Sequence, residues 1–214
     1  MKKALLIAGS LALGSQAALA GEWDGFYVGG GIAQTEYTNS YTDRDYDWFG
    51  GTLEESTTRV TPSVHVGYNM SNENVVFGIE ADYRQANMRT DTYYSFDVFK
   101  QDQFDSSMSA RLRLGIASGN TLVYATAGVA QMETEHQWIE DDDVPDSWPA
   151  FENDKTGQAI GFGIERKVGD TLSIRGEWQR ITLPHVTEFN IQRQHRFQVE
   201  DASESVGIGA SFHF

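Results

Sequence analysis

Apolar and polar residues alternate along much of the chain, which is the spacing that a β-strand gives to the residues on its two faces. The last ten residues show the pattern best. Val206, Ile208, Ala210, Phe212 and Phe214 are apolar, and the residues between them are small or polar. Roughly ten residues of such alternation are enough for a tilted strand to cross a membrane. The segment is therefore predicted to be a membrane-crossing strand with one face on lipid.

Seven earlier segments repeat this alternation. They cover roughly residues 25–35, 59–68, 77–84, 108–116, 121–131, 160–165 and 172–179. In the fifth of them both faces are weakly apolar. Its lipid-facing set is predicted to be Val123, Ala125, Ala127 and Val129. In the second, Pro62 cannot donate a hydrogen bond to a neighbouring strand, so we expect it at a bulge near the outer rim.

The connections between these segments alternate in length. Short turns are expected at residues 69–74, 118–120 and 167–170. Long polar stretches cover roughly residues 36–58, 87–105, 133–155 and 181–202. Outer-membrane barrels have this asymmetry, with short periplasmic turns and long extracellular loops. The pattern predicts an all-β protein, an eight-stranded antiparallel up-and-down transmembrane β-barrel with four long extracellular loops.

Charged residues lie on one face of four predicted strands. They are four acids and four bases: Glu80, Asp82, Glu165 and Glu177 with Arg84, Arg111, Arg113 and Arg175. A soluble lipocalin-like barrel would also have eight strands but would turn its apolar face inward. In lipid the polar face must be the inner one. Because buried charges persist when they are paired, we favour a salt-bridge network that fills the lumen, with a narrow or gated ion path as the alternative.

The N-terminal residues have the pattern of a secretory signal, with Lys2 and Lys3 before an apolar run and a small-residue cleavage site at 18–20. We therefore expect a signal peptide at residues 1–20 and a barrel domain at 21–214. The formal charge of −15 becomes −17 when the two lysines of the signal are removed, which argues against nucleic acid as a partner. With no cysteine in the chain, disulfides and thiol catalysis are excluded.

Three stretches carry a family resemblance. The opening Trp23-Asp24-Gly25-Phe26-Tyr27-Val28-Gly29-Gly30, the strand at 172–178 and the terminal Phe212-His213-Phe214 resemble the outer-membrane β-barrel domain family. That family includes the small porin-family, opacity-type and OmpA-transmembrane-like surface proteins of Gram-negative bacteria. The resemblance implies a location in the cell outer membrane, contact with its lipids and lipopolysaccharide, and a terminal Phe214 that the outer-membrane assembly machinery reads.

Two clusters invite a chemical interpretation. Glu140, Asp141, Asp142 and Asp143 are hard-cation ligands by type, but the stretch lacks the Gly and terminal Glu of a calcium-binding loop. A solvated loop is the default, with divalent ions that bridge to lipopolysaccharide phosphates as a weaker alternative. We assign no metal and no cofactor.

A barrel enzyme acting on lipid A would need its nucleophile and base on the lipid face. The candidates Ser63, His65 and His213 are predicted to face inward, so the protein is not expected to be an enzyme.

Aromatic residues fall into two groups. A first group near the strand ends fits interfacial girdles: Trp23, Phe26, Tyr68, Tyr83, Trp178, Phe212 and Phe214. A second group lies in the long stretches: Tyr46, Trp48, Phe49, Tyr93, Tyr94, Phe96, Trp138 and Trp148. These residues could form adhesive hot spots, pack the loops together or extend the strands above the membrane.

The sequence thus favours a structural or surface-exposed outer-membrane protein, with weak porin-like activity left open. The alternatives are an adhesin or small-ligand module that uses the loops against a host surface, and, less favoured, a lipid A-modifying enzyme.

Overall fold

The computed structural model describes residues 23–214 except 46–50, 94–97, 141–150, 153–154 and 191–194. The described residues form the strands β1 (Gly25–Asp43), β2 (Thr52–Asn72), β3 (Val75–Tyr93), β4 (Val98–Ser118), β5 (Thr121–Glu140), β6 (Phe151–Glu152), β7 (Gly157–Lys167), β8 (Leu172–Thr182), β9 (Val186–Asn190) and β10 (His195–His213). No helix in this described part is both long and apolar enough to cross a membrane.

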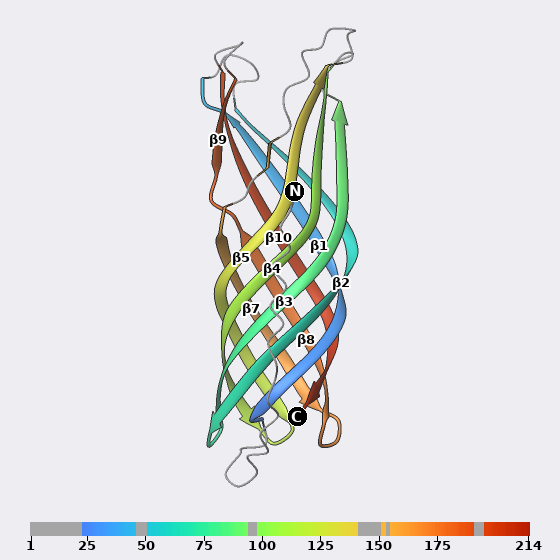
Figure 1. Ribbon diagram of the computed structural model, residues 1–214, viewed down its shortest axis with the longest axis vertical. Coiled ribbons are helices and arrows are strands. Elements are labelled where there is room, and N and C mark those ends of the chain that lie inside the picture. The colour runs from blue at the N-terminus through green and yellow to red at the C-terminus, as the bar shows by residue number, and fades with distance from the viewer. Residues whose placement is uncertain (1–22, 46–50, 94–97, 141–150, 153–154, 191–194) are drawn as a thin grey trace, which may run out of the picture.

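Eight of the strands close into a ring. Each of β1, β2, β3, β4, β5, β7, β8 and β10 pairs antiparallel with the next, and β10 pairs with β1 from Tyr27↔His213 to Asp43↔Phe197. Figure 1 shows these ribbons wound around one long axis, with tight turns at the end where the C-terminus lies. The predicted eight-stranded up-and-down barrel is confirmed.

The apolar side chains of the alternating pattern point outward. Leu112 and Ile208, on opposite parts of the ring, are 69% and 67% exposed. On β5 the predicted set also faces out, with Val123 and Val129 more than half exposed. In the long strands this apolar band lies toward the short-turn end, and in β7 and β8 it takes up most of the strand, which suits the roughly ten residues that a tilted strand needs to cross a membrane.

Much of the four stretches expected to be loops is strand instead. β1 runs on to Asp43, β2 begins at Thr52, β4 begins at Val98 and β5 ends at Glu140. The outward residues of these extensions are polar, as Glu36 and Glu204 show, because they lie beyond the apolar band and face water. Both faces of the extensions are rich in polar residues, so the hydropathy alternation fades although the backbone pairing continues.

Beyond the apolar band the barrel divides into two sheets. The pairing of β2 with β3 ends at Ser63↔Arg84, and that of β7 with β8 ends at Gln158↔Thr182. Past these points β2, β1, β10 and β9 form one sheet, and β3, β4, β5 and β6 form the other. We call these extensions the sheet pair. In Figure 1 the two sheets diverge at the end of the barrel opposite the C-terminus.

Pro62 does not lie at a bulge as predicted. β1 and β2 pair through Ile32↔Pro62 without a register shift. The pairing with β3 begins only at the next residue, Ser63, so the proline marks the point where the two strands separate. A proline has no N–H to donate, which suits a strand position with a free edge. The register shifts between described strands fall instead at Gln85/Met88 of β3 and at Phe104/Ser106 of β4.

Candidate functional site: the layered interior of the barrel

Apolar side chains close the short-turn end of the lumen. Trp23, Val76, Leu122 and Tyr124 are buried together there. Trp23 was expected in the lipid-facing girdle, and this prediction is wrong. Its ring lies inside, where its Nε1 donates to the carbonyl of Gly119 at 3.4 Å. The residue precedes β1, so the period-two rule that orients strand residues does not apply to it.

The charged layer lies above this base. All eight residues proposed for the lumen charge network point into the barrel. Glu80 is at its centre: its carboxylate accepts from Arg111 Nη2 at 2.7 Å, from Arg175 Nη1 at 2.6 Å and from the Tyr27 hydroxyl at 2.8 Å. Glu177 is held by Arg111 Nη1 at 2.7 Å and by Arg175 at 3.2 Å. Two arginines thus share two carboxylates from strands across the lumen.

A second pair lies nearer the base. Arg113 donates to the Glu165 carboxylate, and both side chains are buried. The guanidinium also lies 3.7 Å from the centroid of the Tyr124 ring, within cation–π distance. His213 Nε2 approaches Glu165 Oε1 at 3.2 Å. Both carboxylate oxygens of Glu165 therefore have a partner inside the barrel.

Arg84 differs from the other three arginines. Its guanidinium donates to Thr61 Oγ1 and to Gln179 Oε1, each at 3.3 Å. The neighbouring acid, Asp82, is instead held by Arg111 at 2.9 Å and by the hydroxyl of Ser109. Among the described residues, no carboxylate forms an ion pair with Arg84.

The serines and histidines of the lumen do not form a catalytic triad. In a triad the base uses one ring nitrogen for the nucleophile and the other for the orienting acid. Here the same atom, His213 Nε2, contacts both Ser173 Oγ at 2.9 Å and Glu165 Oε1 at 3.2 Å. His65 Nε2 contacts Ser211 Oγ at 2.8 Å. Since these side chains are enclosed by the barrel wall, they fill the lumen and do not face lipid.

An apolar layer crosses the lumen above the charges. Its members are Tyr37, Ala86, Met88, Phe104, Ala130, Met132, Ala159, Ile181 and Leu183. They come from six strands around the ring and from the residue that follows β8. The Tyr37 and Phe104 rings face each other across the lumen, with centroids 5.1 Å apart. All nine residues are buried, so the layer is a packed core inside the barrel.

A second polar layer lies between the two sheets of the sheet pair. Lys100 of β4 pairs with Asp102 at 2.7 Å and with Glu55 of β2 at 3.2 Å. His136 of β5 contacts Asp102 through Nδ1 at 2.8 Å and Asp201 of β10 through Nε2 at 3.3 Å. Glu55 and Asp201 belong to one sheet, whereas Lys100, Asp102 and His136 belong to the other. The layer therefore ties the two sheets together where their backbones no longer pair.

Tyrosines complete this upper layer. The Tyr37 hydroxyl donates to Asp201 Oδ1 at 2.5 Å, and the Tyr41 hydroxyl donates to Asp102 Oδ1 at 3.2 Å. Burial raises the pKa of both phenols well above the usual range, and the two aspartates add to the effect. Burial alone would disfavour a charged His136. Its hydrogen bonds to Asp102 and Asp201 outweigh burial and raise the pKa of the ring to about 9.

This upper layer was missed by sequence reasoning, which placed its residues in loops. The available signal was the period-two spacing of Tyr37, Asn39 and Tyr41 and of Lys100 and Asp102. The acidic candidate is only partly visible: Glu140 ends β5, and Asp141, Asp142 and Asp143 lie outside the described residues. Of the aromatics expected in the loops, Tyr93 and Trp138 lie in strands. The others lie outside the described residues: Tyr46, Trp48, Phe49, Tyr94, Phe96 and Trp148.

Comparison with known proteins agrees with this architecture. A family model described as "Outer membrane protein beta-barrel domain" matches residues 4–214. The chain belongs to this family. It is therefore an outer-membrane protein of the Gram-negative type, with its apolar band in the lipid and its sheet pair on the side of the long connections, which in such barrels is the extracellular side.

The individual proteins that this chain is similar to have low sequence identity with it. The "22 kDa outer membrane protein" of Rhizobium leguminosarum bv. viciae is 29% identical over 195 residues, which are 90% of this chain and 80% of that protein. Among solved structures, Neisserial surface protein A has a TM-score of 0.50 at 12% identity, over 88% of this chain and 97% of the other. Ail of Yersinia pestis has a TM-score of 0.47 at 13% identity, over 88% and 99%. The likeness to Neisserial surface protein A shows the fold alone.

Proposed function

We propose that this protein is a structural, surface-exposed component of the outer membrane whose lumen is closed. The apolar layer is the observation that carries the proposal. An ion that crosses it would lose its hydration without gaining polar partners, which is a large energetic barrier. The order along the strands supports this: β4 places Arg111 below, Phe104 in the layer and Lys100 above. The charged side chains thus fill the interior of the barrel and do not form an ion path.

Planar-bilayer recording tests the closed lumen. The refolded wild-type protein should produce no steady single-channel steps, and the bilayer should remain as silent as with an equal amount of detergent alone. Reproducible steps whose amplitude changes in Arg111→Ala would contradict the proposal, because they would place the current in the lumen beside that arginine.

The same proposal covers the partners of the barrel. The apolar band fits the acyl chains of outer-membrane lipids and lipopolysaccharide. The last strand ends on Phe214, which is exposed on the lipid side while its backbone N–H donates to the carbonyl of Phe26 at 2.9 Å. This placement leaves the ring free for contact with the assembly machinery. No enzymatic activity is proposed, since the lumen histidines and serines are used in packing.

A binding role is the second candidate, and the sheet pair favours it. The pair extends the barrel beyond the lipid on two braced sheets, and the exposed Arg196–Asp45 ion pair at 2.7 Å joins β10 to the residues after β1 at the outer end of one sheet. A braced platform loses little entropy when it engages a host surface or a small ligand. The test is adhesion of vesicles that carry the protein to cultured host cells. The candidate requires that adhesion falls when residues 46–50 are replaced by a Gly-Ser linker, while folding is retained.

A further inference from the structure

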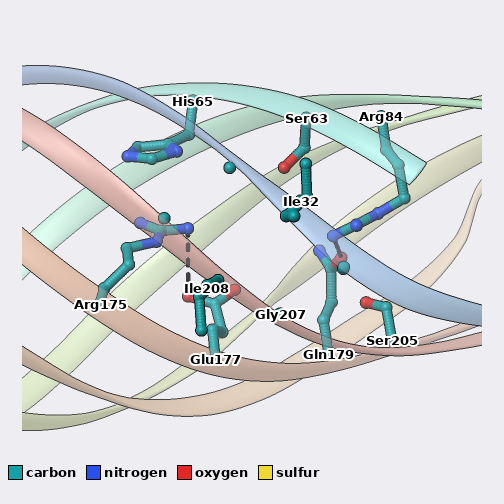
Figure 2. A pocket seen from close by; sticks show the side chains of 13 residues that line it. Ile32, Ser63, His65, Arg84, Arg175, Glu177, Gln179, Ser205, Gly207 and Ile208 are labelled. Atoms are coloured by element: carbon teal, nitrogen blue, oxygen red, sulfur yellow. Dashed lines mark hydrogen bonds and ion pairs between the residues drawn. The ribbon is translucent and has the colours of Figure 1, made fainter. Parts of the chain in front are cut away.

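A small cavity lies inside the barrel at the level where β2 and β3 separate. Its volume is about 30 Å³, enough for one or two water-sized groups. Side chains from three strands reach toward it: Ser63, His65, Arg84, Arg175, Glu177 and Gln179. Figure 2 shows Arg84 and Gln179 converging from opposite sides, with Arg175 and Glu177 at the other end of the space.

Glycines make the room for this cavity. Gly31 of β1 and Gly207 and Gly209 of β10 are inward positions that line it without side chains. At Gly31 an added Cβ would come within 2.3 Å of the Ile208 carbonyl oxygen, and at Gly207 within 2.6 Å of the Ala33 Cβ. These positions therefore cannot be filled without shifting the backbone. The space is a built feature of the β1–β10 pairing.

The charge around the cavity is uneven. Arg175 is compensated by Glu80 and Glu177, but Arg84 has only two neutral acceptors at 3.3 Å. Arg84 is 8% exposed. A guanidinium keeps its charge at any physiological pH, so it cannot escape this environment by losing a proton. Leaving a buried charge without a counter-charge is costly. The arrangement therefore calls for an anion.

We propose that the cavity binds one small monovalent anion of chloride size, with Arg84 as its counter-charge. An ion of this size fits a space that takes one or two water-sized groups. The hydroxyl of Ser63, which points to the interior beside Arg84 in Figure 2, is the second donor. A halide at this place would contact Arg84 directly, whereas the lumen carboxylates form their ion pairs with the other three arginines.

The pairing of β2 with β3 ends at the same point. Ser63 and Arg84 are the last paired residues between β2 and β3, and beyond them the two backbones do not pair. The barrel wall therefore lacks a hydrogen-bonded ladder directly above the cavity. The proposal places the entry of the ion at this separation, on the same side of the apolar layer as Arg84. The site is thus compatible with a lumen that does not conduct.

Bromide replaces chloride in the first test and is located by its anomalous scattering. Crystals of the wild-type protein grown in bromide should show an anomalous peak in the cavity, within hydrogen-bonding distance of Arg84 Nη1 or Nη2. A cavity that holds only water in these crystals overturns the proposal. This measurement needs no variant, so it does not depend on whether a substitution folds.

Anion-dependent stability is the second test. The refolded wild-type protein in micelles should have a higher unfolding temperature in chloride than in gluconate of equal ionic strength, because gluconate is too large for the cavity. At a chloride concentration ten times the dissociation constant, the unfolding equilibrium constant should fall about 11-fold. Arg84→Gln should abolish the difference. The matched control is Arg89→Gln on the same strand, where the exposed arginine pairs with Asp91 at 3.0 Å. An equal chloride response in Arg84→Gln overturns the proposal.

Discussion

At the scale of single residues, the interior is organised by arginines that reach across the lumen. Arg111 contacts Glu80, Asp82 and Glu177, which stand on β3 and β8, at 2.7 to 2.9 Å. Asp82 depends on Arg111 for its ion pair, whereas Glu80 and Glu177 are shared with Arg175. The contribution of one arginine therefore includes the penalty of every acid that it would leave unpaired.

Arg111→Ala should destabilise the barrel by about 3–5 kcal/mol, because it leaves the buried Asp82 without its ion pair and leaves Glu80 and Glu177 to share Arg175 alone. The measurement is urea unfolding of the protein refolded into vesicles. Arg180→Ala is the control, since Arg180 is half exposed and lies 3.9 Å from Glu204, and its loss should cost under about 1 kcal/mol. Equal effects at the two positions would mean that the interior charges are hydrated rather than buried.

The lipid-facing residues of β10 allow a second prediction. Ile208→Lys places a charge near mid-membrane, where it should cost roughly 2–4 kcal/mol and prevent folding both in vesicles and in cells. Phe214 lies at the interface, so Phe214→Lys should fold in vesicles but insert poorly in living cells. Normal insertion of Phe214→Lys in cells would show that the terminal ring is not an assembly signal.

At the scale of elements, the two sheets of the sheet pair are joined by side-chain contacts, whereas the strands of the barrel wall are joined by backbone hydrogen bonds. Between β5 and β10 the connection runs through the ring of His136 to Asp201, and between β4 and β2 through Lys100 to Glu55. The sheet pair should therefore respond to pH, since the pKa of one of its connecting groups, His136, is about 9 in the folded protein.

His136 sets the direction of that response. Because folding raises its pKa from 6.5 to about 9, its contribution is complete below about pH 6.5 and is lost as the pH rises through 9. The shift corresponds to a contribution on the order of 3 kcal/mol. Wild-type protein should therefore need less urea to unfold at pH 9.5 than at pH 6. His136→Gln should lack most of this difference, and an equal pH dependence in both proteins would assign it to other groups.

At the scale of the whole molecule, closure of the ring determines how the protein resists unfolding. Within the lipid band every strand has a partner on both sides, so unfolding has no free edge from which to start. Unboiled protein in detergent should therefore migrate differently from boiled protein on a denaturing gel. Arg180→Ala should show the same shift as the wild type. Identical mobility of boiled and unboiled samples would contradict a closed barrel.

The sequence alone determined the part of the protein that meets lipid. A membrane on the outside demands apolar residues at every second position, so the alternation at residues 206–214 and in seven other segments sufficed for the fold and strand number. It also assigned the facing of the lumen charges, because in lipid the polar face can only point inward. Even the ambiguous strand at 121–131 was oriented correctly.

Only the tertiary structure decided how the segments beyond the membrane are folded and which residues pair with one another. Tyr37, Phe104 and His136 stand on strands whose outer faces meet water, so both faces tolerate polar residues and the periodic signal vanishes. The sequence pattern also does not show which charged residues pair. Arg84 and Arg111 both occupy inward positions of the alternation, but their placement around the ring gives Arg111 three carboxylates and Arg84 none. The pattern records which face a residue takes, and closure of the ring determines its neighbours.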